Sequence, residues 1–243
     1  MNALSIEKNW FFKFLFGEYY FTIKEYDKTI RQKPQYSDAY FWRAYYKRKA
    51  GKTTGVIEDF NKKLEFEPND LMAIEHRSFA KMDIGDYAGA IEDHNKILNF
   101  DSKNISALVN RAVANMALGN YSSALEDCDS AIEIDQKDQA AYVNRSSANL
   151  ALENYKAAIE DSNSAIKLNP ESQSAFFNKA LALFKAKIFT ESIENCKIAI
   201  KLDPKCGDAY FICGHANDIL GNKKEAKKDL RMAKKLGCRK TKI

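Results

Sequence analysis

Apolar and small residues recur along the chain with the period of an α-helix, in two blocks separated by a short turn. In the clearest stretch, Ile105 to Asp138, the first block ends near Leu118 and the second begins at Tyr121. Gly119 and Asn120 lie between them, where a helix ends and the chain reverses direction. The pattern predicts a pair of antiparallel helices joined by a tight turn.

The same pattern returns every 34 residues, and seven frames in one register extend from Ala3 to Lys240 without an insertion. Position 15 of the frame is glycine in five of the seven frames, and position 32 is proline in four. A single helical hairpin cannot bury both of its faces, so we expect one stacked array over residues 3–240. The frames begin at Ala3, Ser37, Leu71, Ile105, Gln139, Gln173 and Gly207.

A helix–turn–helix of this length, with small residues at positions 8 and 20, aromatic or apolar residues at 4 and 17 and proline at 32, resembles the tetratricopeptide repeat. The resemblance covers essentially the whole chain. It implies an all-α fold, a right-handed α-solenoid of antiparallel helix pairs whose first helices line a concave groove. It also implies a non-enzymatic scaffold or adaptor for protein binding. The first frame is the loosest, because Trp10 stands where a small residue is expected.

Position 6, which points into the groove in this family, is asparagine in three successive repeats. Carboxamides both donate and accept hydrogen bonds, and the row resembles the asparagine ladder in the repeat domain of O-linked N-acetylglucosamine transferase. We therefore expect an extended peptide segment of a partner protein to bind along it. The alternative is that asparagine followed by arginine is simply common repeat consensus. The candidate residues are Asn110, Asn144 and Asn178 with the apolar neighbours Val109, Val143, Phe177, Met116, Leu150 and Phe184.

Arginine at position 7 is matched by aspartate at position 23 in four repeats. Where position 23 becomes Asn195, position 7 becomes Lys179. We expect an ion pair that joins the two helices of each of these repeats, with a basic groove for acidic ligands as the alternative. The expected pairs are Arg43–Asp59, Arg77–Asp93, Arg111–Asp127 and Arg145–Asp161.

One well-known partner of the family is not expected. The clamp that grips the C-terminal Glu-Glu-Val-Asp of heat-shock chaperones needs lysine and asparagine at positions 5 and 9 of one repeat. It also needs asparagine at position 6 of the next repeat, then lysine and arginine at positions 2 and 6 of a third. Around Asn144 the chain instead has Val109 and Val113, then Ser174 and Asn178. No window supplies the clamp.

The positive charge of the chain gathers at its C-terminal end. The net charge is +5, and residues 223–242 contain ten lysines and arginines against two acids. This predicts a basic terminal helix and short tail over residues 223–243, which we interpret as a solvated cap of the array. Contact with a polyanion is the alternative. Nucleic acid is not the expected partner, because interleaved aromatic residues and recognition motifs are lacking.

Aromatic residues gather at the opposite end, in the first two frames. A terminal repeat has no neighbour on one side, so an apolar surface is expected to be exposed there. A second hypothesis therefore makes the protein an assembly subunit that forms a homo-oligomer, or docks on a fixed partner, through this end. The candidate interface residues are Trp10, Phe11, Phe12, Phe14 and Trp42.

No pattern indicates catalysis, a metal site or a cofactor. His76, His94 and His215 are dispersed without metal-ligand spacing, and His94 falls at an inward position typical of a packed core residue. Residues 51–54 look like the end of a phosphate-binding loop, but Tyr46 stands where that motif requires glycine. No serine or cysteine has a recognisable base beside it.

Cysteine usage and hydropathy suggest a compartment. The five cysteines include no CxxC pair, which favours a reduced, cytoplasmic protein. The most apolar run, Trp10 to Phe16, is interrupted by Lys13 and is too short to span a membrane.

Overall fold

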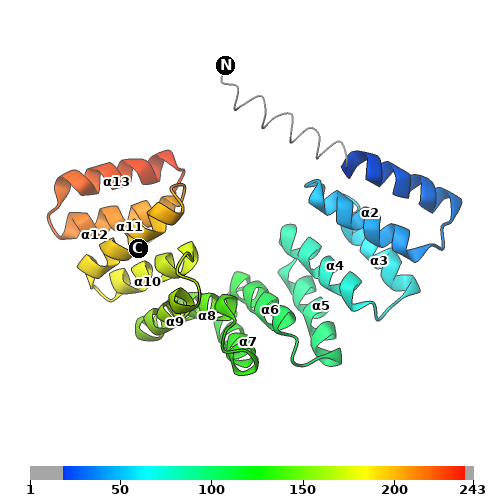
Figure 1. Ribbon diagram of the computed structural model, residues 1–243, viewed down its shortest axis with the longest axis horizontal. Coiled ribbons are helices and arrows are strands. Elements are labelled where there is room, and N and C mark those ends of the chain that lie inside the picture. The colour runs from blue at the N-terminus through cyan, green and yellow to red at the C-terminus, as the bar shows by residue number, and fades with distance from the viewer. Residues whose placement is uncertain (1–18, 239–243) are drawn as a thin grey trace, which may run out of the picture. The chain divides into compact units, whose positions relative to one another are not determined.

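A computed structural model describes residues 19–238, and the regular structure in that range is entirely helical. Residues 19–32 form a helix, and antiparallel pairs joined by short turns follow it (Figure 1). The all-α repeat fold predicted from the sequence is confirmed. The pairs are α2 (Ser37–Lys49) with α3 (Val56–Phe66), α4 (Leu71–Asp83) with α5 (Tyr87–Phe100), α6 (Ile105–Ala117) with α7 (Tyr121–Ile134), α8 (Gln139–Ala151) with α9 (Tyr155–Leu168), α10 (Gln173–Lys185) with α11 (Phe189–Leu202), and α12 (Gly207–Ile219) with α13 (Lys223–Lys235).

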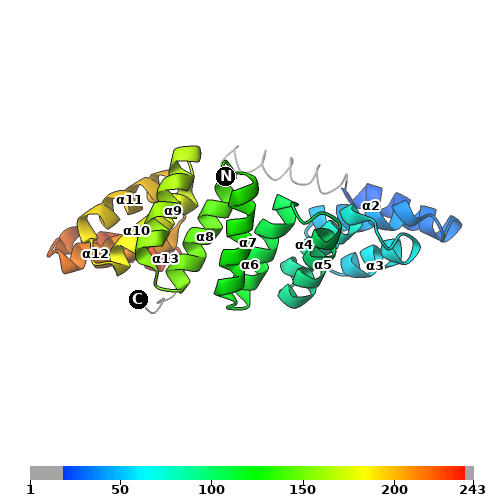
Figure 2. The ribbon, with the colours of Figure 1, turned by 90° about the horizontal axis from the view of Figure 1, so that it is seen from below.

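The chain divides between Ala114 and Asn115, inside α6, into two compact units. In the first unit α2, α3 and α4 pack against one another in chain order, and α4 packs against α5. In the second unit α7 to α13 pack in chain order, each against the next (Figure 2). First helices also contact each other there, α8 with α10 and α10 with α12. The single array over residues 3–240 stays a prediction.

A residue with positive φ follows most of the first helices and allows the tight turn. Glycine fills this place at Gly85 and Gly119, both with φ of 81°. Glu153 and Lys187 occupy the same place in later repeats with φ of 62° and 65°. A left-handed backbone costs a residue with a side chain about 1–2 kcal/mol. The helix pairing therefore dictates the turn even where glycine is absent.

Small side chains let the two helices of a pair approach closely. Ser146 on α8 donates to the carbonyl of Ala158 on α9 at 2.9 Å, and Ser192 on α11 donates to the carbonyl of Ala180 on α10 at 2.8 Å. In the last pair Gly214 faces Leu230, whose Cγ would lie only 2.7 Å from a Cβ at that position. A larger residue at position 8 would push the helices apart.

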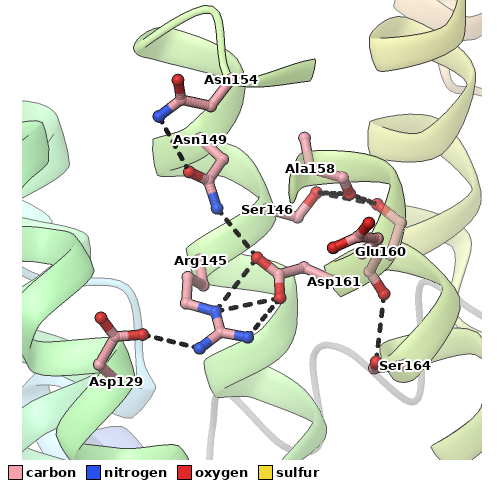
Figure 3. Close-up of polar contacts among 10 residues, drawn as sticks. Asp129, Arg145, Ser146, Asn149, Asn154, Ala158, Glu160, Asp161 and Ser164 are labelled. Atoms are coloured by element: carbon pink, nitrogen blue, oxygen red, sulfur yellow. Dashed lines mark hydrogen bonds and ion pairs between the residues drawn. The ribbon is translucent and has the colours of Figure 1, made fainter. Parts of the chain in front are cut away.

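Arginine side chains join three consecutive helices. Arg145 on α8 donates to Asp161 on α9, with Nη2 2.5 Å from Oδ1, and its Nη1 donates to Asp129 on α7 at 2.7 Å (Figure 3). Asp161 is buried, so the guanidinium compensates its charge in place of water. Two other arginines have the same double engagement: Arg43 with Asp59 and Asp27, and Arg77 with Asp93 and Asn61.

These contacts test the ion pairs expected from the sequence. The pairs of Arg43, Arg77 and Arg145 with their aspartates are confirmed. Arg111 donates to Asn95 on α5 at 2.6 Å. Its partner in the prediction, Asp127, belongs to the other unit, and that pairing stays a prediction. The additional bond from each arginine to the preceding helix was not anticipated.

A buried lysine joins α2, α3 and the start of α4. Lys63 is 2% exposed, and its Nζ lies 2.7 Å from Asp38, 2.8 Å from Glu67 and 3.2 Å from Asp70. Burial alone would lower the pKa of Lys63, but its hydrogen bonds to the three carboxylates outweigh burial and raise the pKa above its ordinary value. Ala131 and Ala165 occupy this position in later repeats. The repeat of α2 and α3 therefore uses charge where these later repeats use a small apolar side chain.

His94 on α5 is fully buried, and neither of its ring nitrogens has a hydrogen-bond partner. Its ring lies 6.5 Å from that of Phe79. It is a packed core residue, as predicted. Burial lowers the pKa of His94 from 6.5 to about 4.

The buried histidine predicts a pH-dependent stability for the first unit. Between pH 6.5 and pH 4 the unfolded chain binds a proton at His94 that the folded chain does not bind, so stability falls as the pH falls through this window. We expect a loss of about 2 kcal/mol between pH 7 and pH 5 from this residue. Thermal unfolding of His94→Leu should lose this component of the pH dependence, whereas His215→Gln should keep it. Identical pH profiles for the wild type and His94→Leu would contradict the prediction.

The arginine contacts predict a second stability effect. Arg145→Ala leaves Asp161 buried without its cation, and we expect the free energy of unfolding to fall by about 2–3 kcal/mol. Arg145→Ala combined with Asp161→Ala should be less destabilised than Arg145→Ala alone, because no charge remains buried. Lys62→Ala, which breaks an exposed pair with Glu65, is the control and should change little. Urea unfolding measures all four proteins. A double variant that is less stable than Arg145→Ala would refute the explanation.

Candidate functional site

The nine residues predicted to bind a peptide lie on the first helices α6, α8 and α10. Val109 and Asn110 belong to the first unit and the other seven to the second. Positions 5, 9 and 12 of a repeat fall on one face of its first helix, because they are separated by four and three residues. On this face Val143 and Leu150 on α8 and Phe177 on α10 are half-buried. Met116 on α6 is also half-buried.

Asn178 is less available than the sequence suggested. Its amide nitrogen donates to the carbonyl of Val143 at 3.2 Å and to Oγ of Ser147 at 2.9 Å, and the residue is 7% exposed. Both amide hydrogens are therefore used to join α10 to α8. The expectation of a donor facing a bound peptide is corrected, and the side chain offers a ligand only its acceptor oxygen.

The three asparagines are not equivalent in their contacts. Asn110 is half-buried, and its amide nitrogen donates within α6 to Oγ of Ser106 at 3.3 Å. Ser106 in turn donates to Glu75 on α4 at 2.9 Å. Asn144 is half-buried on α8. Asn110 and Asn178 therefore make different contacts and do not form a regular ladder of identical amide bonds.

Phe184 requires a second correction. It is 7% exposed, and its ring lies edge-on to Phe189 at 5.5 Å and 67°. It forms one core cluster with Ile193, Cys196 and Ile212. Phe184 therefore packs in the core of the second unit, which it stabilises, and it does not line an accessible surface.

Only part of the predicted aromatic interface can be placed. Trp10, Phe11, Phe12 and Phe14 lie outside the described residues. Trp42 on α2 is 40% exposed, and its ring makes edge contacts with Phe41 at 5.1 Å and Tyr45 at 5.7 Å. The first-helix face of the first unit therefore carries an aromatic cluster, continued by His76 on α4, whose ring lies 5.5 Å from that of Tyr45.

The basic terminal helix predicted from the sequence corresponds to α13. Ala226 and Ala233 are its buried residues, and its lysines are exposed. Lys223 pairs with Asp218 at 2.8 Å on the surface. The remaining residues of the predicted tail, 239–243, lie outside the described range.

Within residues 19–238 no group of three histidine, cysteine or acidic side chains is able to hold a metal ion. In the same range no helix is long and apolar enough to cross a membrane. Cys128 and Cys213 form no disulfide, and burial raises the pKa of both to about 12, which keeps both thiols protonated.

Comparison with family models identifies the repeat. Two models described as tetratricopeptide repeat match residues 105–138 and 143–205. The helix pairs of the structure run through both matched segments. Residues 105–138 and 143–205 are tetratricopeptide repeats. No curated protein sequence matches it significantly.

Solved structures of other tetratricopeptide repeat proteins share the fold. A tetratricopeptide repeat protein from Parabacteroides merdae aligns with a TM-score of 0.74 at 18% identity, over 94% of each chain. MamA aligns with a TM-score of 0.59 at 27% identity, over 66% of this chain and 94% of its own. YrrB, described as a TPR protein with an unusual peptide-binding site, aligns with a TM-score of 0.57 at 19% identity, over 74% of this chain and 93% of its own.

The family fixes the general role. Tetratricopeptide repeat proteins mediate protein–protein interactions, and the family is generally non-enzymatic. This tetratricopeptide repeat protein is therefore a protein-binding scaffold. The contacts of Asn178 and Phe184 identify them as residues that hold the repeats together, as distinct from residues that are accessible to a partner.

The internal bonds of Asn178 lead to a prediction about stability. Asn178→Ala removes two hydrogen bonds between α10 and α8, and we expect the free energy of unfolding to fall by about 1–2 kcal/mol. Asn163→Ala is the matched control, because Asn163 is an exposed asparagine on α9. Urea unfolding of the two variants should separate them. Equal stability would show that the bonds to Val143 and Ser147 contribute nothing.

Proposed function

We propose that this tetratricopeptide repeat protein binds an extended peptide segment of a partner protein along the first helices of its repeats. The observation that carries the proposal is the face of α8 and α10, where half-buried Val143, Leu150 and Phe177 lie beside Asn144. Such a face combines apolar contact area with a carboxamide. None of these four residues is charged, so the face does not require a charged ligand.

An extended peptide matches this chemistry. Its backbone offers unpaired N–H and C=O groups at each residue, and a carboxamide is able to satisfy one of each. Alternate side chains of the peptide point toward the surface, where they bury area against apolar residues such as Phe177. Each such hydrogen bond contributes about 1 kcal/mol net, so we expect an affinity on the order of micromolar.

The three asparagines have different roles in this proposal. Asn178 holds α10 against α8 and presents an acceptor oxygen, while Asn110 and Asn144 supply the remaining carboxamides on α6 and α8. The peptide-binding site described for YrrB lies on the same fold and supports the class of partner. The aromatic cluster at Trp42 and the basic helix α13 are the alternative surfaces, for self-association and for a polyanion.

Capture of partners from a lysate tests the proposal. The variant Asn110→Ala/Asn144→Ala removes two carboxamides without touching the bonds of Asn178, and we expect about a 25-fold weaker affinity, since each lost bond is worth about fivefold. The triple variant that includes Asn178→Ala should bind more weakly still. Proteins retained by the wild type and lost from both variants would be identified by mass spectrometry.

Two controls make the capture experiment decisive. Asn163→Ala changes an exposed asparagine of a second helix and should retain every partner of the wild type. Circular dichroism of each variant establishes that the helices remain folded. Partner lists that are identical for the wild type and the double variant would refute binding through the first helices and move the site to α13 or to the aromatic end.

A further inference from the structure

The repeat formed by α12 and α13 keeps the surroundings of an arginine side chain but has no arginine. In the repeat of α8 and α9, Arg145 occupies position 7. Sixty-eight residues later, two repeats on, the same position is Cys213.

The site of Arg145 has three components, a carboxylate, a tyrosine ring and an asparagine, and Figure 3 shows the carboxylate of Asp161 and the amide of Asn149. Asp161 accepts the guanidinium hydrogen bonds, and the ring of Tyr142 lies 5.5 Å from Cζ of Arg145. Asn149 donates to Oδ2 of Asp161 at 3.0 Å and itself accepts from Asn154 at 3.4 Å, which orients the carboxylate. The repeat of α2 and α3 has the same carboxylate and tyrosine, Asp59 and Tyr40, around Arg43.

All of these components recur around Cys213. Tyr210 takes the place of Tyr142, and Asp229 takes the place of Asp161. Asn217 donates to Oδ2 of Asp229 at 3.4 Å and accepts from Asn222 at 3.1 Å, the same relay as in the earlier repeat. No lysine or arginine among residues 19–238 forms an ion pair with Asp229. The three groups that surround an arginine in the earlier repeat are therefore present, and no cation from the described residues pairs with the carboxylate.

A cavity occupies the place of the missing side chain. It has a volume of about 440 Å³, lies between α11, α12 and α13, and includes Tyr210, Cys213, Asn217 and Asp229 in its lining. Ile200 and Met232 form the apolar part of its wall. The thiol of Cys213 hydrogen-bonds to the carboxylate of Asp229. It is neutral and much shorter than an arginine side chain, so it does not fill this space or balance the charge of the carboxylate.

We propose that this cavity binds a guanidinium group, supplied by an arginine side chain of a partner protein. The geometry that holds Arg145 and Arg43 within the chain would hold the partner's arginine in the same way. The planar fork would donate to Asp229, and its face would stack on Tyr210. This inference does not rest on peptide binding along the first helices, because none of the cavity residues belongs to that face.

The other charged residues around the cavity set the strength of binding. Glu225 adds a second carboxylate, while Lys197 and Lys228 stand where the earlier repeat has Asp129 and Glu160. A guanidinium in this cavity therefore meets the oriented carboxylate of Asp229, but it has no counterpart of Asp129, because Lys197 stands in that place. We expect a dissociation constant on the order of millimolar for an isolated arginine side chain. A lysine side chain should bind more weakly, because an ammonium has no planar fork to match Asp229 and Tyr210.

The experiment is a titration of the full chain with N-acetyl-arginine amide, followed by amide NMR shifts. Saturable shifts are expected at Tyr210, Asn217 and Asp229, with smaller shifts from N-acetyl-lysine amide. Asp229→Asn should weaken binding by about tenfold. Glu194→Gln, which removes an exposed carboxylate of α11, is the matched control and should bind like the wild type. A short arginine-containing peptide that binds more tightly than the free amide would identify a polypeptide as the source of the group.

Filling the cavity from within gives an independent test. Cys213→Arg supplies the missing side chain, so it should abolish binding of the arginine amide and raise the melting temperature. If that variant fails to fold, Cys213→Arg with Lys197→Asp restores both carboxylates of the Arg145 site and should fold. Equal shifts from the lysine and arginine amides, unchanged binding in Asp229→Asn, or binding retained after the cavity is filled would each overturn the proposal.

Discussion

A buried aspartate on the second helix of a repeat constrains this fold more strongly than any other side chain in its described part. A carboxylate in a crevice between helices must meet a cation, because an unpaired buried charge costs several kcal/mol. Asp93 and Asp161 each meet an arginine that lies 16 residues earlier. The same arginine reaches an acceptor a further 16 residues earlier, on the preceding helix. In these repeats one side chain therefore links three consecutive helices.

Departures from this arrangement occur in matched sets, as the energetics demand. Where the acid becomes Asn195, the arginine becomes Lys179, and the amide of Asn195 turns to the carbonyl of Glu191 at 2.8 Å. At the junction of α2, α3 and α4 the buried charge is positive instead of negative: it is Lys63, which is surrounded by three carboxylates. Losing one partner alone would leave a charge buried without compensation. The repeat of α12 and α13 is the exception, since it keeps Asp229 and has lost its arginine.

The sequence alone was enough to predict the helix pairs, the turns and three of the ion pairs, because each depends on residue types that recur at a fixed spacing. It was not enough to predict which side chains of the first helices are accessible. Asn110 and Asn178 occupy the same position, yet one bonds within its own helix and the other bonds the preceding repeat. Both asparagines follow a serine at position 2 of their own frame, Ser106 and Ser174. The difference lies at position 9 of the preceding repeat, which is Phe79 for Asn110 and Ser147 for Asn178. Phe184 is buried by neighbouring helices, and no local pattern encodes how far a neighbouring helix covers a position.

The solvent exposure of Asp229 explains how a repeat tolerates an aspartate without its arginine. Asp161 on α9 is 4% exposed, because the next repeat packs against it. Asp229 on α13, the last described helix, is half-buried. Water is therefore able to compensate the charge of Asp229, and the empty cavity carries no large electrostatic penalty. An arginine that enters would displace this water and would not relieve an unpaired buried charge. Its affinity would come from the fit of the planar fork to an oriented carboxylate and from contact with Tyr210. Those two features distinguish a guanidinium from any other cation.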